Sequence, residues 1–373
     1  MNNLNVVKKL SHVFTLFFLC FIIFNILSFF VLEMKKGDNP IISKYGLETL
    51  VTAYPGYDTD TVKDILHENW NSQVVYSTYV QFQEPPKSGK HVNVTSDGFR
   101  LNKPSEKHPL PLDKDFLNIF VFGGSTTFGY GLRDHETIPA QLEELMREKN
   151  PTIRVYNFGR AFYFSTQERI LFEKLLVEGN VPDVAIFIDG LNEFYHPKGD
   201  ATYTGFLNGA MDNSFYAAQK KFFRELPVVN FARLCRDALT QKSEPGSNPK
   251  LPDIQPQESI VLQIINRYVS NASMIKAIAE KNEISSFFFW QPVPEYEMHL
   301  ASHPFYIRED LQTEVNRVKG YVIGQKMLQN AIPGLVWAAE ILDTCKGNFV
   351  DKVHYSAKFN GEIAQFIHDN LTI

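Results

Sequence analysis

The stretch Phe120-Val-Phe-Gly-Gly-Ser-Thr-Thr-Phe-Gly129 decides the fold of this chain. It contains the second half of an apolar run, Leu117 to Phe122, that is typical of a buried strand. Two glycines end the run and allow a tight turn, and Ser125 follows at once. The hydroxyl of Ser125 is therefore expected to stand clear of the sheet edge, as a nucleophile does after a strand.

Other glycine motifs do not fit these letters. The G-x-S-x-G elbow fails because Thr127 stands where its last glycine should be, and a phosphate-binding loop would need a lysine after Gly129. The dinucleotide pattern G-x-G-x-x-G fails because Asp134 follows Gly129 and Gly131 at the third position. At this motif alone, an ordinary strand-to-helix turn remains the alternative to a nucleophile turn.

Three later segments add chemistry to this serine. Tyr156-Asn-Phe-Gly-Arg160 follows a strand-like Ile153 to Val155, and Gly190-Leu-Asn-Glu193 follows another apolar run. Near the C-terminus lies Asp351-Lys-Val-His354. With these four blocks in this order, the chain resembles the SGNH (GDSL-like) hydrolase superfamily from about Leu117 to its end, without residues 199–257.

The resemblance implies a role for each matched residue. Ser125 would be the nucleophile, His354 its base, and Asp351 the acid that fixes the histidine tautomer. The amides of Ser125 and Gly159 and the side chain of Asn192 would hold the oxyanion. Two residues next to the matched ones depart from the usual family pattern. Gly124, before Ser125, and Glu193, after Asn192, each stand where the family usually has aspartate. Asp343 is a lesser candidate for the orienting acid.

Strand-like and helix-like stretches alternate from Leu117 onward, which favours a parallel sheet covered by helices on both faces. The resemblance narrows this α/β class to a three-layer, flavodoxin-like fold. Strands are expected at 117–122, 153–157, 183–189, 284–291 and 335–342. Helices are expected at 137–149, 166–178, 258–281, 307–330 and 357–370. Ser125, Gly159 and Asn192 then follow strand ends, where such sheets place their functional residues.

The N-terminal region divides into three predicted parts. Residues 10–32 are almost wholly apolar and long enough for a transmembrane signal anchor, after a cytoplasmic 1–9. Lysines flank both ends and lean only slightly toward that orientation, which leaves the catalytic part periplasmic or extracytoplasmic. Residues 33–115 form an extension, with helices expected at Ser43–Thr52 and Asp60–Asn69 and a strand at Val74–Phe82. Residues 116–373 form the catalytic domain, in which the insertion at 199–257 is a lid or a surface loop.

Composition excludes several functions. The net charge is −5 and no basic stripe suggests nucleic acid. His299 and His303 are spaced as metal ligands, but Pro304 limits helix there, so no metal or cofactor is expected. Three cysteines cannot all pair, and a disulfide between Cys235 and Cys345 is left open.

The sequence therefore predicts a membrane-anchored serine esterase that cleaves acyl esters, with O-acetyl groups of a surface glycan as the suggested substrate. An O-acyltransferase that modifies a polysaccharide needs the same residues and is the first alternative. A non-catalytic glycan-binding module of an envelope assembly is the second, and an intact Ser-His-Asp set argues against it. The oligomeric state is not readable from the sequence.

Overall fold

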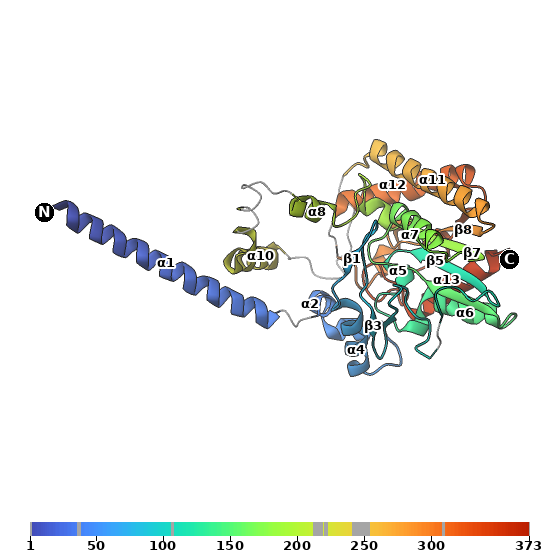
Figure 1. Cartoon of the computed structure of the whole chain (residues 1–373), viewed down its shortest axis with the longest axis horizontal. Helices are drawn as coiled ribbons and strands as arrows, with labels where there is room; N and C mark the ends of the chain where they lie inside the picture. Colours follow the sequence, from blue (N-terminus) through green and yellow to red (C-terminus); the bar gives the residue numbers. More distant parts are fainter. Residues whose placement is uncertain are drawn as a thin grey trace. The chain divides into compact units, whose positions relative to one another are not determined.

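The computed structural model describes residues 2–35, 39–105, 108–211, 219, 223–240, 254–307 and 310–372. The chain forms two compact units. The larger unit comprises Asn39–Thr204 and Glu244–Ile373, and the smaller one comprises Met1–Asp38 and Gly205–Ser243. The larger unit carries the sheet (Figure 1).

A five-stranded sheet organises the larger unit, and all of its strand pairs are parallel. Its spatial order is β6 (Ile153–Asn157), β5 (Leu117–Gly123), β7 (Val184–Asp189), β8 (Ser285–Trp290) and β9 (Val336–Trp337). In chain order this is 2-1-3-4-5, the flavodoxin-like arrangement, so the predicted fold class is confirmed. The order reverses between β5 and β7, and ligands bind at such switch points.

Helices cover both faces of the sheet (Figure 1). One face packs on α6 (Ile138–Arg147) and α13 (Ala357–Asn370). The other packs on α7 (Ser165–Val177), α11 (Glu258–Lys281) and α12 (Leu311–Ala331). These five helices lie within a few residues of their predicted positions.

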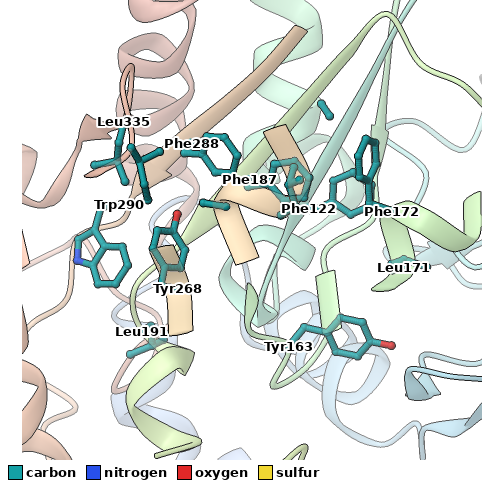
Figure 2. Packing of buried hydrophobic residues seen from close by; sticks show 14 of the residues in the cluster. Phe122, Tyr163, Leu171, Phe172, Phe187, Leu191, Tyr268, Phe288, Trp290 and Leu335 are labelled. Carbon is teal, nitrogen blue, oxygen red and sulfur yellow. The ribbon is translucent and has the colours of Figure 1, made fainter. Parts of the chain in front are cut away.

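Strand side chains alternate between two hydrophobic cores, as the pleat of a strand requires. Ile119 and Val121 face the α6–α13 core, and Phe120 and Phe122 face the opposite one. On that second face the aromatic rings continue across neighbouring strands, and Figure 2 shows this row (Phe122, Phe187, Phe288 and Trp290). The Phe122 and Phe187 rings stack with centroids 4.9 Å apart, so the functional strand ends rest on a fully buried, rigid base.

The segment before β5 is built from short elements. It contains α2 (Pro40–Tyr45), α3 (Leu47–Val51), α4 (Thr59–Trp70), and two hairpins, β1 (Val75–Ser77) with β2 (Gln81–Gln83) and β3 (Lys87–Ser88) with β4 (Asn93–Val94). The predicted strand at Val74–Phe82 is therefore a hairpin, because Tyr79 and Gln81 take positive φ angles and turn the chain. The helix predicted at Ser43–Thr52 is interrupted at Gly46, which has a φ of 76°.

Short helical turns connect the remaining elements. They are α5 (Ser125–Phe128), η1 (Asp134–Glu136), η2 (Asn192–Tyr195), η3 (Tyr296–Ser302) and η4 (Ala339–Ile341). The strand predicted at 335–342 ends early at Trp337, because Ala338 adopts a helical conformation and η4 follows.

The smaller unit contains α1 (Asn2–Lys35), most of α8 (Thr204–Met211) and α10 (Pro227–Thr240). Lys8–Met34 is apolar and long enough to cross a membrane, although a signal sequence has the same features. Within this unit α10 packs on α1: the rings of Phe24 and Phe231 meet edge to face, with centroids 6.3 Å apart. Part of the 199–257 insertion thus contacts the apolar helix, while its predicted loop, Lys242 to Asn248, lies outside the described residues. Cys20, Cys235 and Cys345 are free thiols.

Candidate active site

Ser125 lies at the carboxyl edge of the sheet, as the first residue of α5. Gly124 alone separates it from β5, and this glycine is required by a close contact. A Cβ atom at Gly124 would lie 2.3 Å from Nδ2 of Asn192, far closer than atoms can pack. The turn that presents Ser125 therefore packs closely against the side chain of Asn192. Asn192 follows β7, the strand that pairs with β5.

Asp351 and His354 meet in the loop that precedes α13. Nδ1 of His354 lies 2.6 Å from Oδ2 of Asp351. The other carboxylate oxygen, Oδ1, accepts hydrogen bonds of 2.8 Å from the backbone amides of Val353 and His354. Burial by itself raises the pKa of Asp351, but the His354 ring and these hydrogen bonds outweigh it and lower that pKa. The carboxylate is thus charged and fixed in orientation, as the orienting acid of a triad must be.

The other ring nitrogen of His354, Nε2, is the one that a nucleophile would use as its base. Nε2 is buried and has no hydrogen-bond partner in the described part of the chain, and His354 and Ser125 line the same cleft. To act as a general base, His354 must accept a proton at Nε2 from a nearby donor such as the Ser125 hydroxyl. The structure thus brings Ser125, Asp351 and His354 to one site.

Buried contacts hold the His354 loop from behind. Nζ of Lys352 donates to Oε1 of Glu314 at 2.6 Å, and this pair is buried. Nε2 of His303 donates to the carbonyl oxygen of Lys352 at 2.9 Å, and burial lowers the pKa of His303 to about 4. A neutral His303 explains this contact, because its Nδ1 accepts from the amide of Phe305. His303 therefore supports the loop, and the described residues contain no group of three or more His, Cys, Asp or Glu side chains that could hold a metal ion.

Asn192 and Gly159, two of the predicted oxyanion donors, differ in whether they have a hydrogen left to donate. Asn192 lines the cleft beside Ser125, and its Nδ2 donates one hydrogen to the carbonyl oxygen of Tyr163 at 2.7 Å, which leaves the second hydrogen free. Gly159 is buried, and its amide already donates to Oδ1 of Asn157 at 3.0 Å. A Cβ atom at Gly159 would lie 2.3 Å from the amide nitrogen of Phe128, so this glycine is required by close backbone packing. Because the Gly159 amide already donates to Asn157, the structure does not support its assignment as an oxyanion donor.

Aromatic side chains that the sequence did not single out line the cleft, whose volume is about 600 Å³. The Trp70 ring, from α4, lies edge to face with the His354 ring, with centroids 5.8 Å apart. The Tyr130 ring lies 5.7 Å from both. Other aromatic lining residues are Phe162, Tyr195 and Tyr203. Trp70 was missed because it is remote in sequence from the four blocks and no local motif marks it.

The strand order of the sheet and the positions of the site residues together indicate which known fold this chain resembles. The nucleophile turn follows the first core strand, Asn192 follows the third, and the Asp351–His354 loop precedes the last helix. The chain is SGNH-like in fold.

Solved structures with a similar fold include lipases and esterases. The lipase Lip_vut3 from a goat rumen metagenome shares 12% identity over 68% of this chain and 97% of its own, with a TM-score of 0.41. The acetyl xylan esterase AlAXEase shares 12% identity over 68% and 99%, with a TM-score of 0.39. The esterase EstA from Pseudoalteromonas sp. shares 11% over 68% and 96%, with a TM-score of 0.38. No family profile and no curated protein matches the chain. The similarity concerns the fold alone.

Proposed function

We propose that this SGNH-like protein is a membrane-anchored serine esterase that cleaves acyl esters. One observation carries the proposal. Buried Asp351 and half-buried His354 lie 2.6 Å apart, and Nε2 of His354 has no partner among the described residues in the cleft that also contains Ser125. A charged, oriented acid behind a histidine and a serine in front of it are the parts that activate a hydroxyl nucleophile.

The reaction follows from these positions. Oγ of Ser125 attacks the ester carbonyl carbon while its proton passes to Nε2 of His354, and the carbonyl electron pair moves onto oxygen. Collapse of this oxyanion breaks the bond to the alcohol oxygen, which takes the proton from Nε2 and leaves the acyl group on Ser125. Water then attacks in the same way, so a carboxylic acid departs and the Ser125 hydroxyl is restored.

The lining of the cleft supports an uncharged, ring-shaped alcohol such as a sugar of a surface glycan. It combines aromatic faces with neutral amide and hydroxyl groups. Among the residues that the structure describes, its lining includes no Asp, Glu, Lys or Arg (Asn69, Trp70, Ser72, Gln73, Val74, Ser125, Tyr130, Ala161, Phe162, Leu191, Asn192, Tyr195, Tyr203, Val353 and His354). Aromatic faces supply apolar contact, and a few polar groups fix the orientation of a bound ligand.

We expect the protein to release acetate from p-nitrophenyl acetate and from an O-acetylated neutral oligosaccharide. A serine esterase passes the acyl group to water, so an added unacetylated oligosaccharide should neither become acetylated nor raise the release of p-nitrophenol. Acetylation of the oligosaccharide, measured by mass spectrometry, would instead establish the acyltransferase alternative.

Trp70→Ala tests the sugar part of this proposal. Loss of one aromatic face should lower kcat/KM for the acetylated oligosaccharide by roughly tenfold more than for ethyl acetate, which has no ring to contact. Trp70→Phe keeps a ring beside His354 and serves as the matched control. Equal losses for both esters in Trp70→Ala would show that Trp70 supports His354 without contacting a sugar.

The membrane part of the proposal rests on α1. Lys8–Met34 is only 6% buried within the chain over its most apolar window, which is expected of a helix that faces lipid rather than a protein core. With Lys8 and Lys9 before the apolar residues 10–32, a cytoplasmic N-terminus would leave the catalytic unit periplasmic or extracytoplasmic.

A topology measurement checks this placement. Alkaline phosphatase fused after Ile373 should be active in a bacterial host, because it folds only outside the cytoplasm, and β-galactosidase at the same position should be inactive. The reverse pattern would place the catalytic unit in the cytoplasm. Release of the protein into the soluble fraction, with its N-terminus removed, would identify α1 as a cleaved signal.

A further inference from the structure

The loop that follows β6 contains a backbone amide with no acceptor. Along Gly159–Tyr163, four of the five amides donate hydrogen bonds within the larger unit: Gly159 to Oδ1 of Asn157 (3.0 Å), Arg160 to the carbonyl oxygen of Gly123 (3.0 Å), Ala161 to Oε1 of Glu84 (2.7 Å) and Tyr163 to the carbonyl oxygen of Arg160 (3.4 Å). The amide of Phe162 has no acceptor among the residues that the structure describes.

The backbone of Phe162 is also in an unusual conformation. Its φ angle is 58°, in the left-handed region that bulky residues seldom occupy. Phe162 is the third residue of a turn closed by the hydrogen bond from Tyr163 to Arg160, a position where a positive φ normally calls for glycine. Such conformations persist only where the surroundings enforce them, and they gather at functional sites.

Two neighbours fix the peptide groups around Phe162. Nε2 of His196 lies 3.1 Å from the carbonyl oxygen of Phe162, and Nδ2 of Asn192 donates to the next carbonyl, that of Tyr163. The Phe162 side chain is 51% exposed and lines the cleft that contains Ser125 and Asn192. The turn thus holds Phe162 at the cleft wall, and its next residue, Tyr163, accepts a hydrogen bond from Asn192, the other predicted oxyanion donor.

From these contacts we propose that the backbone amide of Phe162, in place of that of Gly159, binds the oxyanion together with the amide of Ser125 and the side chain of Asn192. This rests on the serine-esterase function proposed above. The strained turn then has a purpose: it leaves one N–H unpaired until negative charge develops on the substrate oxygen. An oxyanion donor prepared in this way does not have to reorganise during the reaction.

Replacing single amides by esters in the full-length protein tests the assignment, because the N–H is removed while the side chain stays. Phenyllactic acid introduced at position 162 by nonsense suppression should lower kcat for p-nitrophenyl acetate by about 100- to 1000-fold, with a much smaller change in KM. Glycolic acid at position 159 removes the amide that the sequence favours and should lower kcat by less than about tenfold, within the range of a structural hydrogen bond.

Lactic acid at position 161 is the matched control, because it removes the amide bonded to buried Glu84. It should lower the melting temperature more than the ester at 162 does, with a kcat loss well below that of the ester at 162. A large kcat loss at 159 with a small one at 162 would overturn the proposal and restore Gly159. Absence of turnover in the parent protein would count against the esterase function itself, so the two failures are distinguishable.

A crystal structure of the protein phosphonylated at Ser125 gives a second, independent measurement. The phosphonyl oxygen mimics the oxyanion and should lie about 3 Å from the amide nitrogen of Phe162. Contact of that oxygen with the amide of Gly159, and none with Phe162, would refute the assignment.

Discussion

Ser125→Ala is expected to abolish both ester hydrolysis and covalent labelling by a fluorophosphonate probe. The probe reacts when the serine oxygen displaces fluoride from phosphorus, which an ordinary hydroxyl does negligibly. In the structure Ser125 shares its cleft with Nε2 of His354, which has no hydrogen-bond partner among the described residues, so a base is available to it. Loss of a triad nucleophile lowers kcat by about 10⁴- to 10⁶-fold. The parent protein should label once.

Two further variants sharpen this result. His354→Ala should lose labelling nearly as completely, because Ser125 then keeps its proton. Ser270→Ala, an exposed serine on α11, should label like the parent. Melting temperatures of all three should stay close to that of the parent, since none of these side chains fills the core. Labelling that survives Ser125→Ala would move the nucleophile elsewhere, and a folded parent that does not label would favour the glycan-binding alternative.

The sheet and the meeting of Ser125, Asp351 and His354 at one site were predictable, because their signals are local or follow a general rule of fold. A short apolar run ended by glycines identifies β5 without any knowledge of the tertiary structure. The carboxyl ends of parallel strands meet at one edge, so Ser125 and Asn192 were expected to lie together once β5 and β7 were placed. The spacing of Asp351 and His354 is short enough for one loop to bring them together.

The oxyanion loop could not be predicted from residue types. A glycine favours close backbone approach, and Gly159 is needed for that reason alone: its packing against Phe128 excludes a side chain. The amide that remains free belongs to Phe162, a residue whose type gives no sign of a positive φ. Which amide is free depends on acceptors that come from elsewhere in the chain, such as Glu84 from the segment before β5.

The aromatic wall illustrates the same limit. Trp70 contacts His354 because α4 packs beside the turn after Ser125, where the Asn69 side chain donates to the carbonyl oxygen of Leu132 at 3.2 Å. Tyr54 fixes the same turn through the carbonyl oxygen of Gly131. These contacts join segments far apart in sequence, and no periodicity or motif in either segment indicates them.

Asp351→Asn should lower kcat by about 10⁴-fold while the fold is retained, and the hydrogen bonds of Asp351 explain why. Oδ1 accepts from two backbone amides, so the carbonyl oxygen of an asparagine would occupy this position. Its NH₂ group would then face Nδ1 of His354, where Oδ2 now lies. An NH₂ group is a donor, so it would favour the tautomer with the proton on Nε2. That nitrogen could no longer accept the proton of Ser125.

Asp343→Asn is the matched control, because Asp343 is exposed and lies in the chain between β9 and the His354 loop. It should keep near-normal kcat, whereas Asp351→Asn should label with fluorophosphonate very slowly and melt close to the parent temperature. The pKa of Asp351 lies below its ordinary value of about 3.9, so its carboxylate stays charged above that pH. If Asp351→Asn turns over normally and Asp343→Asn does not, Asp343 is the orienting acid, and the 2.6 Å contact between Asp351 and His354 has only a structural role.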